Sequence, residues 1–186
     1  MMVLIVLIVI AVVVGLIVIS LYNSLVTARN EVKNSWSQID VQLNRRHDLI
    51  PNLVETVKGY MNHERQTLEA VTAARQQAVN LTGASVEDKA RVENALSQTL
   101  KSLFAVTESY PDLKANQNFL ALQEELTSTE NKISFARQYY NDSVMRLNNR
   151  IQVFPTNILA GMFNFTESQF FAAESAEARQ PVAVKF

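Results

Sequence analysis

The first 22 residues carry no charged side chain, and this stretch constrains the chain more than any other feature. It reads MMVLIVLIVIAVVVGLIVISLY, and the first charged residue is Arg29. As an α-helix, 22 residues rise about 33 Å, enough to cross a hydrocarbon core of about 30 Å. A cleaved signal peptide is the alternative, but the stretch lacks a basic start, its apolar run is long, and no small-x-small site follows it. We therefore expect residues 1–22 to form a retained anchor in the lipid bilayer.

Basic residues near the anchor predict its orientation. Arg29 and Lys33 follow the apolar stretch closely, and no basic residue precedes it. Lysine and arginine are enriched on the cytoplasmic side of membrane spans. We therefore expect a single-pass protein with its N-terminus outside and the rest of the chain in the cytoplasm.

Apolar residues recur at helical spacing after the anchor and predict an all-α fold. From Leu25 to Leu43 they step by seven, four, three and four positions, and similar stripes follow. Only four glycines and four prolines interrupt the chain, which favours long helices over hairpins. We expect an antiparallel four-helix up-and-down bundle whose helices end near residue 47 and span 49–81, 86–108 and 112–150. The expected domains are the anchor 1–22, the bundle 23–150 and a tail 151–186.

Two smaller signals mark helix starts in this scheme. Ser85 is expected to cap the helix that begins at residue 86, because its hydroxyl can accept from a backbone N–H of the first turn. Pro111 is expected to open the last helix, where the missing N–H of proline is tolerated.

The stretch RRHDLIPNL, residues 45–53, raises the question of whether the first bundle helix ends there. Asp48 can cap a new helix, with Pro51 in its first turn, where the absent N–H does little harm. The heptad register nevertheless passes through unbroken, since Leu43 and Ile50 are seven residues apart. One continuous, proline-kinked helix from 22 to 81 is therefore the alternative. We expect the turn.

The charged residues of this stretch have a simple interpretation if the turn forms. Arg45 and Arg46 then lie at the C-terminal end of a helix, where solvated cations suit the negative pole of the helix dipole. A docking patch formed by the two arginines is the alternative.

The sequence offers little for catalysis. It contains two histidines, His47 and His63, and no cysteine. The Glu-x-x-His pairs of di-iron bundles are absent, since Asn44 and Tyr60 stand three residues before the histidines. No zinc-protease helix, phosphate-binding loop or nucleophile elbow occurs. The net charge of −1 gives no strong attraction to nucleic acid. We expect solvated or capping histidines, and no enzyme activity, cofactor, metal site or nucleic-acid partner.

Aromatic residues gather towards the expected membrane end. Tyr22-Asn23-x-x-Val26-x-x-x-Asn30 matches Tyr140-Asn141-x-x-Val144-x-x-x-Asn148, and the two segments lie at neighbouring ends of an up-and-down bundle. Tyrosine suits the headgroup layer, although the match can also be chance.

Six of the nine phenylalanines follow residue 150: Phe154, Phe163, Phe165, Phe170, Phe171 and Phe186. This tail can pack on its own bundle, touch lipid or meet a second subunit. Because no apolar stripe is left over to cover the rings, and buried aromatics dominate many interfaces, we expect a homo-oligomer with contacts in the tail or the anchor.

Two long blocks resemble the LemA family of bacterial membrane proteins. They are NSWSQIDVQLNRRHDLIPNLVETVKGYMNHE and ESYPDLKANQNFLALQEELTSTENKISFARQYYND, and Phe154-Pro155 with the aromatic tail fits the C-terminus of that family. The resemblance implies a bacterial inner-membrane protein with one N-terminal span and an antiparallel helical bundle inside. It implies no catalytic residue. The signature positions receive structural roles only: Arg45, Arg46, Asp48, Pro51 and Asn52.

Together these observations predict a non-enzymatic, membrane-anchored helical scaffold that self-associates or organises partners at the bacterial inner membrane. The alternative is an adaptor for a membrane protease or a signalling enzyme, monomeric until its client binds. A hydrolase or metalloenzyme fits the sequence least well.

Overall fold

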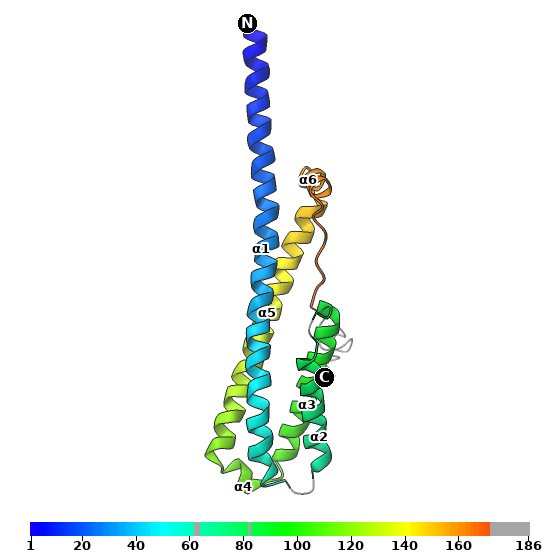
Figure 1. Cartoon of the computed structure of the whole chain (residues 1–186). Coiled ribbons are helices and arrows are strands. Elements are labelled where there is room, and N and C mark those ends of the chain that lie inside the picture. The colour runs from blue at the N-terminus through cyan, green and yellow to red at the C-terminus, as the bar shows by residue number, and fades with distance from the viewer. Residues whose placement is uncertain (62–63, 82, 172–186) are drawn as a thin grey trace, which may run out of the picture. The chain divides into compact units, whose positions relative to one another are not determined.

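The computed structural model describes residues 1–61, 64–81 and 83–171, and helices are the regular structure throughout these ranges. In chain order they are α1 (Met2–Lys58), α2 (Arg65–Val79), α3 (Val86–Thr107), α4 (Pro111–Lys114), α5 (Gln117–Gln152) and α6 (Thr156–Met162) (Figure 1). No strand occurs in these ranges, so the predicted all-α class is confirmed.

The helix α1 is continuous over 57 residues, and the turn expected near residue 48 is wrong. Asp48 and Pro51 both lie inside α1. The anchor, the first expected bundle helix and the start of the second are therefore one helix. Leu43 and Ile50, seven residues apart, are both buried, so the apolar stripe runs straight through the predicted corner. The N-terminal part of α1 is long and apolar enough to cross a membrane.

Proline is tolerated inside α1 because another helix takes over the hydrogen bond that proline cannot make. Pro51 has no N–H, so the carbonyl oxygen of His47, four residues earlier, has no donor within the helix. The Nε of Arg75, on α2, donates to that oxygen at 2.6 Å. The donor lies 28 residues along the chain from its acceptor. Local sequence rules could not supply this partner, which explains why they favoured a turn.

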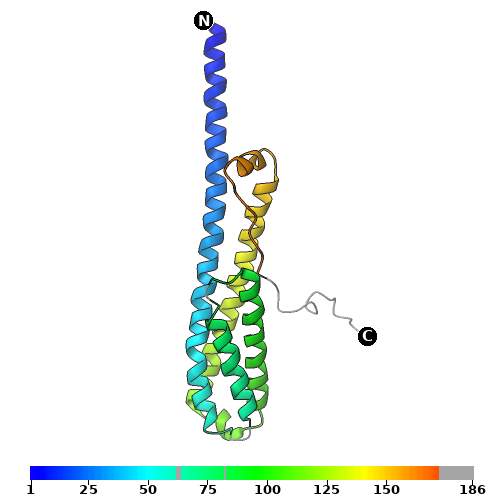
Figure 2. The same cartoon turned by 45° about the vertical axis from the view of Figure 1, so that its right-hand side comes forward.

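The chain turns instead after Lys58, where Gly59 follows and lowers helix propensity. The second expected helix, 49–81, is thereby reduced to α2, which packs beside α3 (Figure 2).

Capping side chains set the starts of α3 and α5. Ser85 accepts from the backbone N–H of Asp88 at 3.1 Å, as predicted. The last expected helix, 112–150, is divided, because α4 ends at Lys114 and a new helix starts at Gln117. The Oδ1 of Asn116 accepts from the N–H groups of Asn118 and Phe119 and so caps α5.

The described chain falls into two compact units. The first comprises Met1–Gln38 and Gln138–Gln169, and the second comprises Ile39–Arg137 with Phe170 and Phe171. Both α1 and α5 contribute residues to each unit. The predicted domain boundaries after residues 22 and 150 stay predictions.

The core of the second unit draws on five helices and the turn after α1. Burial of such aliphatic side chains stabilises the fold by about 1.5–3 kcal/mol each. The buried members are Ile50, Leu53, Val57, Met61, Leu68, Val71, Ala78, Leu96, Leu100, Leu103, Leu113, Phe119 and Leu126.

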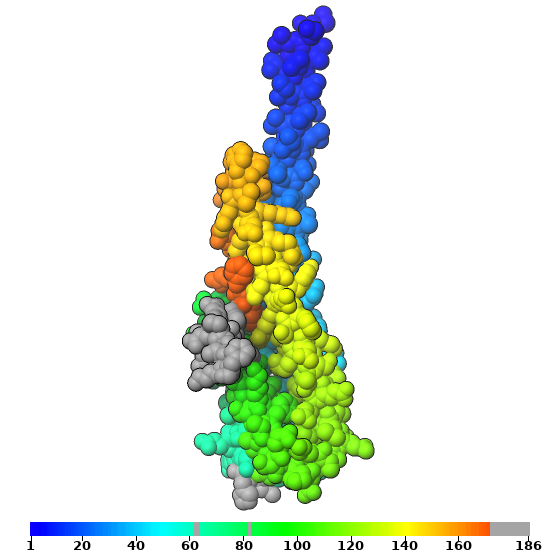
Figure 3. All heavy atoms as spheres, turned by 180° about the vertical axis from the view of Figure 1, so that it is seen from behind, coloured from blue at the N-terminus to red at the C-terminus, as the bar shows by residue number. Residues whose placement is uncertain are grey.

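The first unit has a smaller core, to which the tail contributes. Figure 3 shows the tail, in orange, against the yellow end of α5. Leu159, Ala160 and Phe165 are buried with Leu25 of α1. After α6 the chain returns along α5, where the Asn148 side chain donates to the carbonyl of Ser168 at 3.0 Å and accepts from its N–H at 2.9 Å. The tail therefore contains a short helix, α6, and a following segment that is hydrogen-bonded to α5.

We predict that Pro51→Ala stabilises the protein by less than the roughly 3 kcal/mol that an interior proline usually costs, because Arg75 already serves the His47 carbonyl. Arg75→Ala should lower the free energy of unfolding by about 1–3 kcal/mol, because it leaves that acceptor unpaired. In the Pro51→Ala background the same change should cost less, since the new N–H replaces the lost donor. Denaturant unfolding in detergent micelles measures this double-mutant cycle.

The matched control is Arg91→Ala, which removes an exposed arginine paired with Asp88 and should change stability by less than about 1 kcal/mol. An equal cost of Arg75→Ala with and without Pro51 would show that the two side chains are not coupled.

Candidate functional site

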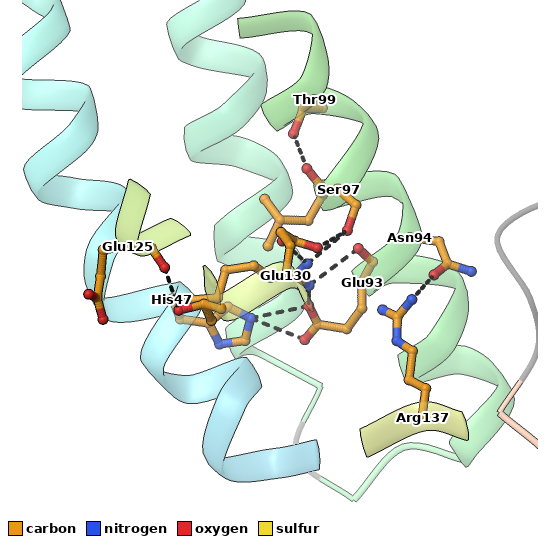
Figure 4. A network of polar contacts seen from close by, with 11 residues as sticks. His47, Glu93, Asn94, Ser97, Thr99, Glu125, Glu130 and Arg137 are labelled. Atoms are coloured by element: carbon orange, nitrogen blue, oxygen red, sulfur yellow. Dashed lines mark hydrogen bonds and ion pairs between the residues drawn. The ribbon is translucent and has the colours of Figure 1, made fainter. Parts of the chain in front are cut away.

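The second unit contains a buried cluster of charged side chains, drawn from three helices (Figure 4). At its centre is Arg46 of α1, whose side chain is 0% exposed. Its guanidinium forms ion pairs with Glu93 of α3 and, at 2.6 Å, with Glu130 of α5. One cation thus joins carboxylates from two other helices.

Two further polar side chains complete this group. The Oγ of Ser97 accepts from Arg46 at 2.8 Å and donates to Glu130 at 3.2 Å. The Nε2 of His47 lies 3.1 Å from Oε1 of Glu93. Figure 4 shows His47, Glu93, Ser97 and Glu130 converging on one point between the helices. We call Arg46, His47, Glu93, Ser97 and Glu130 the Arg46 cluster.

The two neighbouring arginines have opposite environments, which corrects the prediction of a solvated pair. Successive residues of an α-helix point about 100° apart. Arg45 faces outward, where it pairs with Glu125 and keeps 50% of its side-chain surface exposed. Arg46 and His47 face the core, so the predicted solvated or capping role of His47 is also wrong. His63 lies outside the described residues.

The apolar stripe of α1 holds the signal that could have found Arg46. Buried residues of α1 follow in steps of four, three, four, three and four: Ile39, Leu43, Arg46, Ile50, Leu53 and Val57. Arg46 thus occupies a core position of an unbroken heptad pattern. The predicted turn near residue 48 ended the helix within this pattern, and Arg46 was therefore expected to be solvated at a helix end.

The charge state of Glu93 follows from two opposed influences. Burial raises the pKa of Glu93, but the hydrogen bond from His47 and the positive charge of Arg46 lower it by more. The net effect places the pKa below its ordinary value of 4.5. Glu93 is therefore ionised at neutral pH, as a partner for the buried guanidinium.

The polar groups of the cluster are arranged for mutual support. The Ser97 hydroxyl contacts Arg46 and Glu130, not His47, so the geometry builds no serine–histidine pair. No group of three or more metal-ligating side chains occurs among the residues that the structure describes. Glu130 opens towards solvent, with 35% of its side chain exposed, at a cavity of about 330 Å³ between α3 and α5. The arrangement fixes the packing of three helices.

Asp48 and the two tyrosines of the repeated motif lie apart from this cluster. Asp48 is exposed in the middle of α1 and caps no helix. The ring of Tyr22 lies 4.8 Å from that of Phe163. Tyr140 packs edge-on against Trp36 at 5.4 Å and donates its hydroxyl to the carbonyl of Gln169. The two tyrosines therefore have different partners.

The phenylalanines of the tail divide into two sets. Phe165 and Phe171 are buried, and an arginine lies over each ring: Arg29 at 4.8 Å and Arg137 at 4.5 Å. Phe154, Phe163 and Phe170 are at least half exposed, and Phe186 lies outside the described residues. Part of the tail thus packs on its own chain, and part remains on the surface.

We predict that Glu93→Gln lowers the free energy of unfolding at pH 7, by less than the roughly 3–5 kcal/mol of a fully orphaned buried charge, because Glu130 still faces Arg46. The lowered pKa of Glu93 means that its contribution is complete above pH 4.5 and is lost as the pH falls through that lowered value. The acid limb of the stability curve should therefore be shallower in Glu93→Gln than in the wild type. Urea unfolding at a series of pH values measures both effects.

Glu125→Gln is the matched control, because Glu125 pairs with the half-exposed Arg45. It should change stability by less than about 1 kcal/mol. Parallel acid limbs in the wild type and Glu93→Gln would contradict the assignment of an ionised, buried Glu93.

Comparison of the sequence with known proteins identifies relatives of this chain. Protein LemA of Metamycoplasma hominis is 28% identical over 158 residues, covering 83% of this chain and 70% of that protein. Magnetosome protein MamQ 2 of Paramagnetospirillum magneticum and magnetosome protein MamQ of Magnetospirillum gryphiswaldense are 23% and 21% identical over 179 residues. Each of those matches covers 83% of this chain and 66% of the MamQ protein, so the chain spans about two thirds of their length.

The model of the LemA family matches residues 35–186. That range contains the whole Arg46 cluster and the helices α2 to α6. The chain therefore belongs to the LemA family.

Proposed function

We propose that this protein is a membrane-anchored, non-enzymatic helical scaffold that self-associates or organises partners at the bacterial inner membrane. The observation that carries the proposal is the continuity of α1. One helix contains both the apolar segment that fits a bilayer and the residues Ile50, Leu53 and Val57 of the second unit's core. A span joined to a folded unit without a linker suits a protein that holds others at a membrane surface.

The use of the buried charges supports a structural role. Arg46, Glu93 and Ser97 make their polar contacts with each other and with neighbouring helices. A site that binds substrate needs polar groups directed at the ligand. The names of the relatives, protein LemA and magnetosome protein MamQ, are not enzyme names.

A groove in the second unit offers a surface for partners. It has a volume of about 790 Å³ and is lined by α1, α2 and the turn between them. Its apolar lining includes Ile50, Val54 and Leu68, and charged side chains such as Glu55 and Arg65 stand around them. Apolar centres with polar rims are typical of protein interfaces.

Self-association has support from aromatic residues on the surface of the second unit. Phe135 of α5 is 72% exposed, and Phe170 of the tail is 51% exposed. Aromatic side chains are enriched at interfaces and often carry much of the binding energy.

The proposed topology predicts the labelling of introduced cysteines in intact cells. The exposed cations Arg29 and Lys33 follow the apolar segment and favour a cytoplasmic location for the rest of the chain. Gln76 is exposed on α2, and the chain has no native cysteine. Gln76→Cys should therefore resist a membrane-impermeant thiol reagent until the cells are permeabilised, whereas Met2→Cys should react at once. The opposite labelling pattern would reverse the orientation.

The proposed self-association predicts a native mass above that of a monomer in detergent or nanodiscs. Phe135→Ser should weaken assembly by about tenfold or more, as expected when a residue worth about 1.4 kcal/mol or more is removed from an interface. Phe170→Ser tests the tail, and it leaves in place Leu159 and Phe165, which a truncation after Ile151 would strip from the core. Gln98→Ser, on an exposed position of α3, is the control.

Circular dichroism should show unchanged helicity in all three variants. A monomeric wild type would favour the alternative of an adaptor that waits for its client. If both phenylalanine variants keep the native mass of the wild-type assembly, the contact between subunits does not involve these two rings.

A further inference from the structure

The short helix α6 and its flanks carry an exposed apolar surface in the first unit. Five large apolar side chains of this segment are at least half exposed: Val153, Phe154, Ile158, Met162 and Phe163. We call these residues the α6 patch. Apolar groups gathered in this way usually mark a contact with another molecule or with a membrane.

The opposite side of α6 holds this patch against α1. Leu159 and Ala160 are buried together with Leu25, and Leu21 and Tyr22 pack against the same group. The ring of Phe163 lies 4.8 Å from that of Tyr22. In Figure 2 the first unit shows α6 beside the segment of α1 that follows the apolar run. The patch is thus attached to α1 at one defined level.

That level coincides with the end of the apolar run. The run ends at Tyr22, and about 20 helical residues span the hydrocarbon core, so Tyr22 belongs in the interfacial layer when α1 crosses the bilayer. The partner of Tyr22, Phe163, then lies in the same layer. The other exposed apolar residues of α6 are within two turns of it along the chain.

Cations flank the same level on the side away from the anchor. Arg150 donates to the carbonyl of Ser24 at 2.7 Å, and Arg29 is exposed with its guanidinium over the Phe165 ring. Basic side chains at this depth meet the phosphate groups of lipids and are attracted by anionic headgroups. Apolar side chains at the interface with cations just beyond them form the pattern of an interfacial membrane-binding element.

We propose that the α6 patch inserts into the interfacial layer of the bilayer beside the anchor, with Arg29 and Arg150 at the phosphate groups. The inference rests on the proposed membrane anchoring. Phospholipid is the occupant because the patch continues the lipid-facing surface of α1 and is bordered by cations. A single spanning helix can tilt in the bilayer. A second membrane contact at α6, next to the end of the apolar run, would restrict the tilt of α1.

Depth-dependent quenching tests this in the full chain, which has no native cysteine. A single cysteine carrying an environment-sensitive fluorophore is placed at Ile158, at Ala11 in the apolar run, or at the exposed Val41 of the second unit. The proteins are reconstituted in vesicles of zwitterionic and anionic phospholipid that contain nitroxide lipids, with the nitroxide either near the headgroup or near the end of the acyl chain.

We expect Ile158→Cys to be quenched more by the shallow nitroxide, Ala11→Cys more by the deep one, and Val41→Cys by neither. Quenching at Ala11 without quenching at Ile158 would overturn the α6 inference and leave the anchor intact. Absence of quenching at Ala11 would overturn the anchor, and the inference with it. These two failures are therefore distinguishable.

A second copy of the chain is the competing occupant, and nanodiscs that hold one copy separate it from lipid. Shallow quenching at Ile158 should persist in them. The proposal would be overturned if the fluorophore at Ile158 is shielded from water only in vesicles with many copies of the protein, and if neither nitroxide lipid quenches it. That result would assign the patch to a contact between subunits.

A charged substitution in the α6 patch provides a second, independent test of insertion. With the fluorophore on Val153→Cys, Met162→Asp should reduce shallow quenching on the order of twofold, because a carboxylate opposes interfacial insertion. The matched control Asn157→Asp replaces an exposed polar residue of the same helix and should leave the quenching unchanged. Equal quenching in Met162→Asp and the control would contradict insertion of α6.

Discussion

The buried positive charge of Arg46 is the constraint on which the packing of the second unit depends. A guanidinium that is fully removed from water needs carboxylates close by, since an unpaired buried charge is strongly destabilising. Glu93 and Glu130 supply them from α3 and α5. Because one guanidinium contacts both carboxylates, a shift of either helix along α1 would separate the charges. The cluster therefore specifies helix register in a way that interchangeable aliphatic contacts do not.

A second unpaired polar group arises from Pro51, five residues after Arg46 on α1, and a side chain of another helix again supplies its partner. Pro51 leaves the His47 carbonyl without a donor, and Arg75 of α2 provides one. The side chain of His47 faces Glu93 at the same time. One turn of α1 thus has polar ties to α2, α3 and α5. A proline that would weaken an isolated helix here creates a specific attachment point for its neighbour.

The sequence was sufficient for the features that depend on local or periodic patterns. The all-α class and the Ser85 cap followed from apolar spacing and residue type. The continuity of α1 did not, because the hydrogen-bond donor that makes Pro51 acceptable lies on another helix. Arg46 was assigned to solvent for the same reason, although its place in the stripe between Leu43 and Ile50 marked it as a core position. The carboxylates that pair with Arg46 are those of Glu93 and Glu130, which lie on other helices, so the local sequence around Arg46 does not reveal them.

The tail shows a different limit of sequence reasoning, because its phenylalanines are chemically identical and yet take opposite roles. Phe165 turns inward beneath Arg29, while Phe163, two residues earlier, keeps half of its surface exposed beside Tyr22. The backbone between them explains the division: Asn164 has a positive φ of 53°, in the left-handed region that asparagine tolerates better than most residues. This reversal after α6 directs one ring to the core and leaves the other on the surface. Composition alone marks an aromatic tail, but the local backbone decides which rings stabilise the chain and which remain for its surroundings.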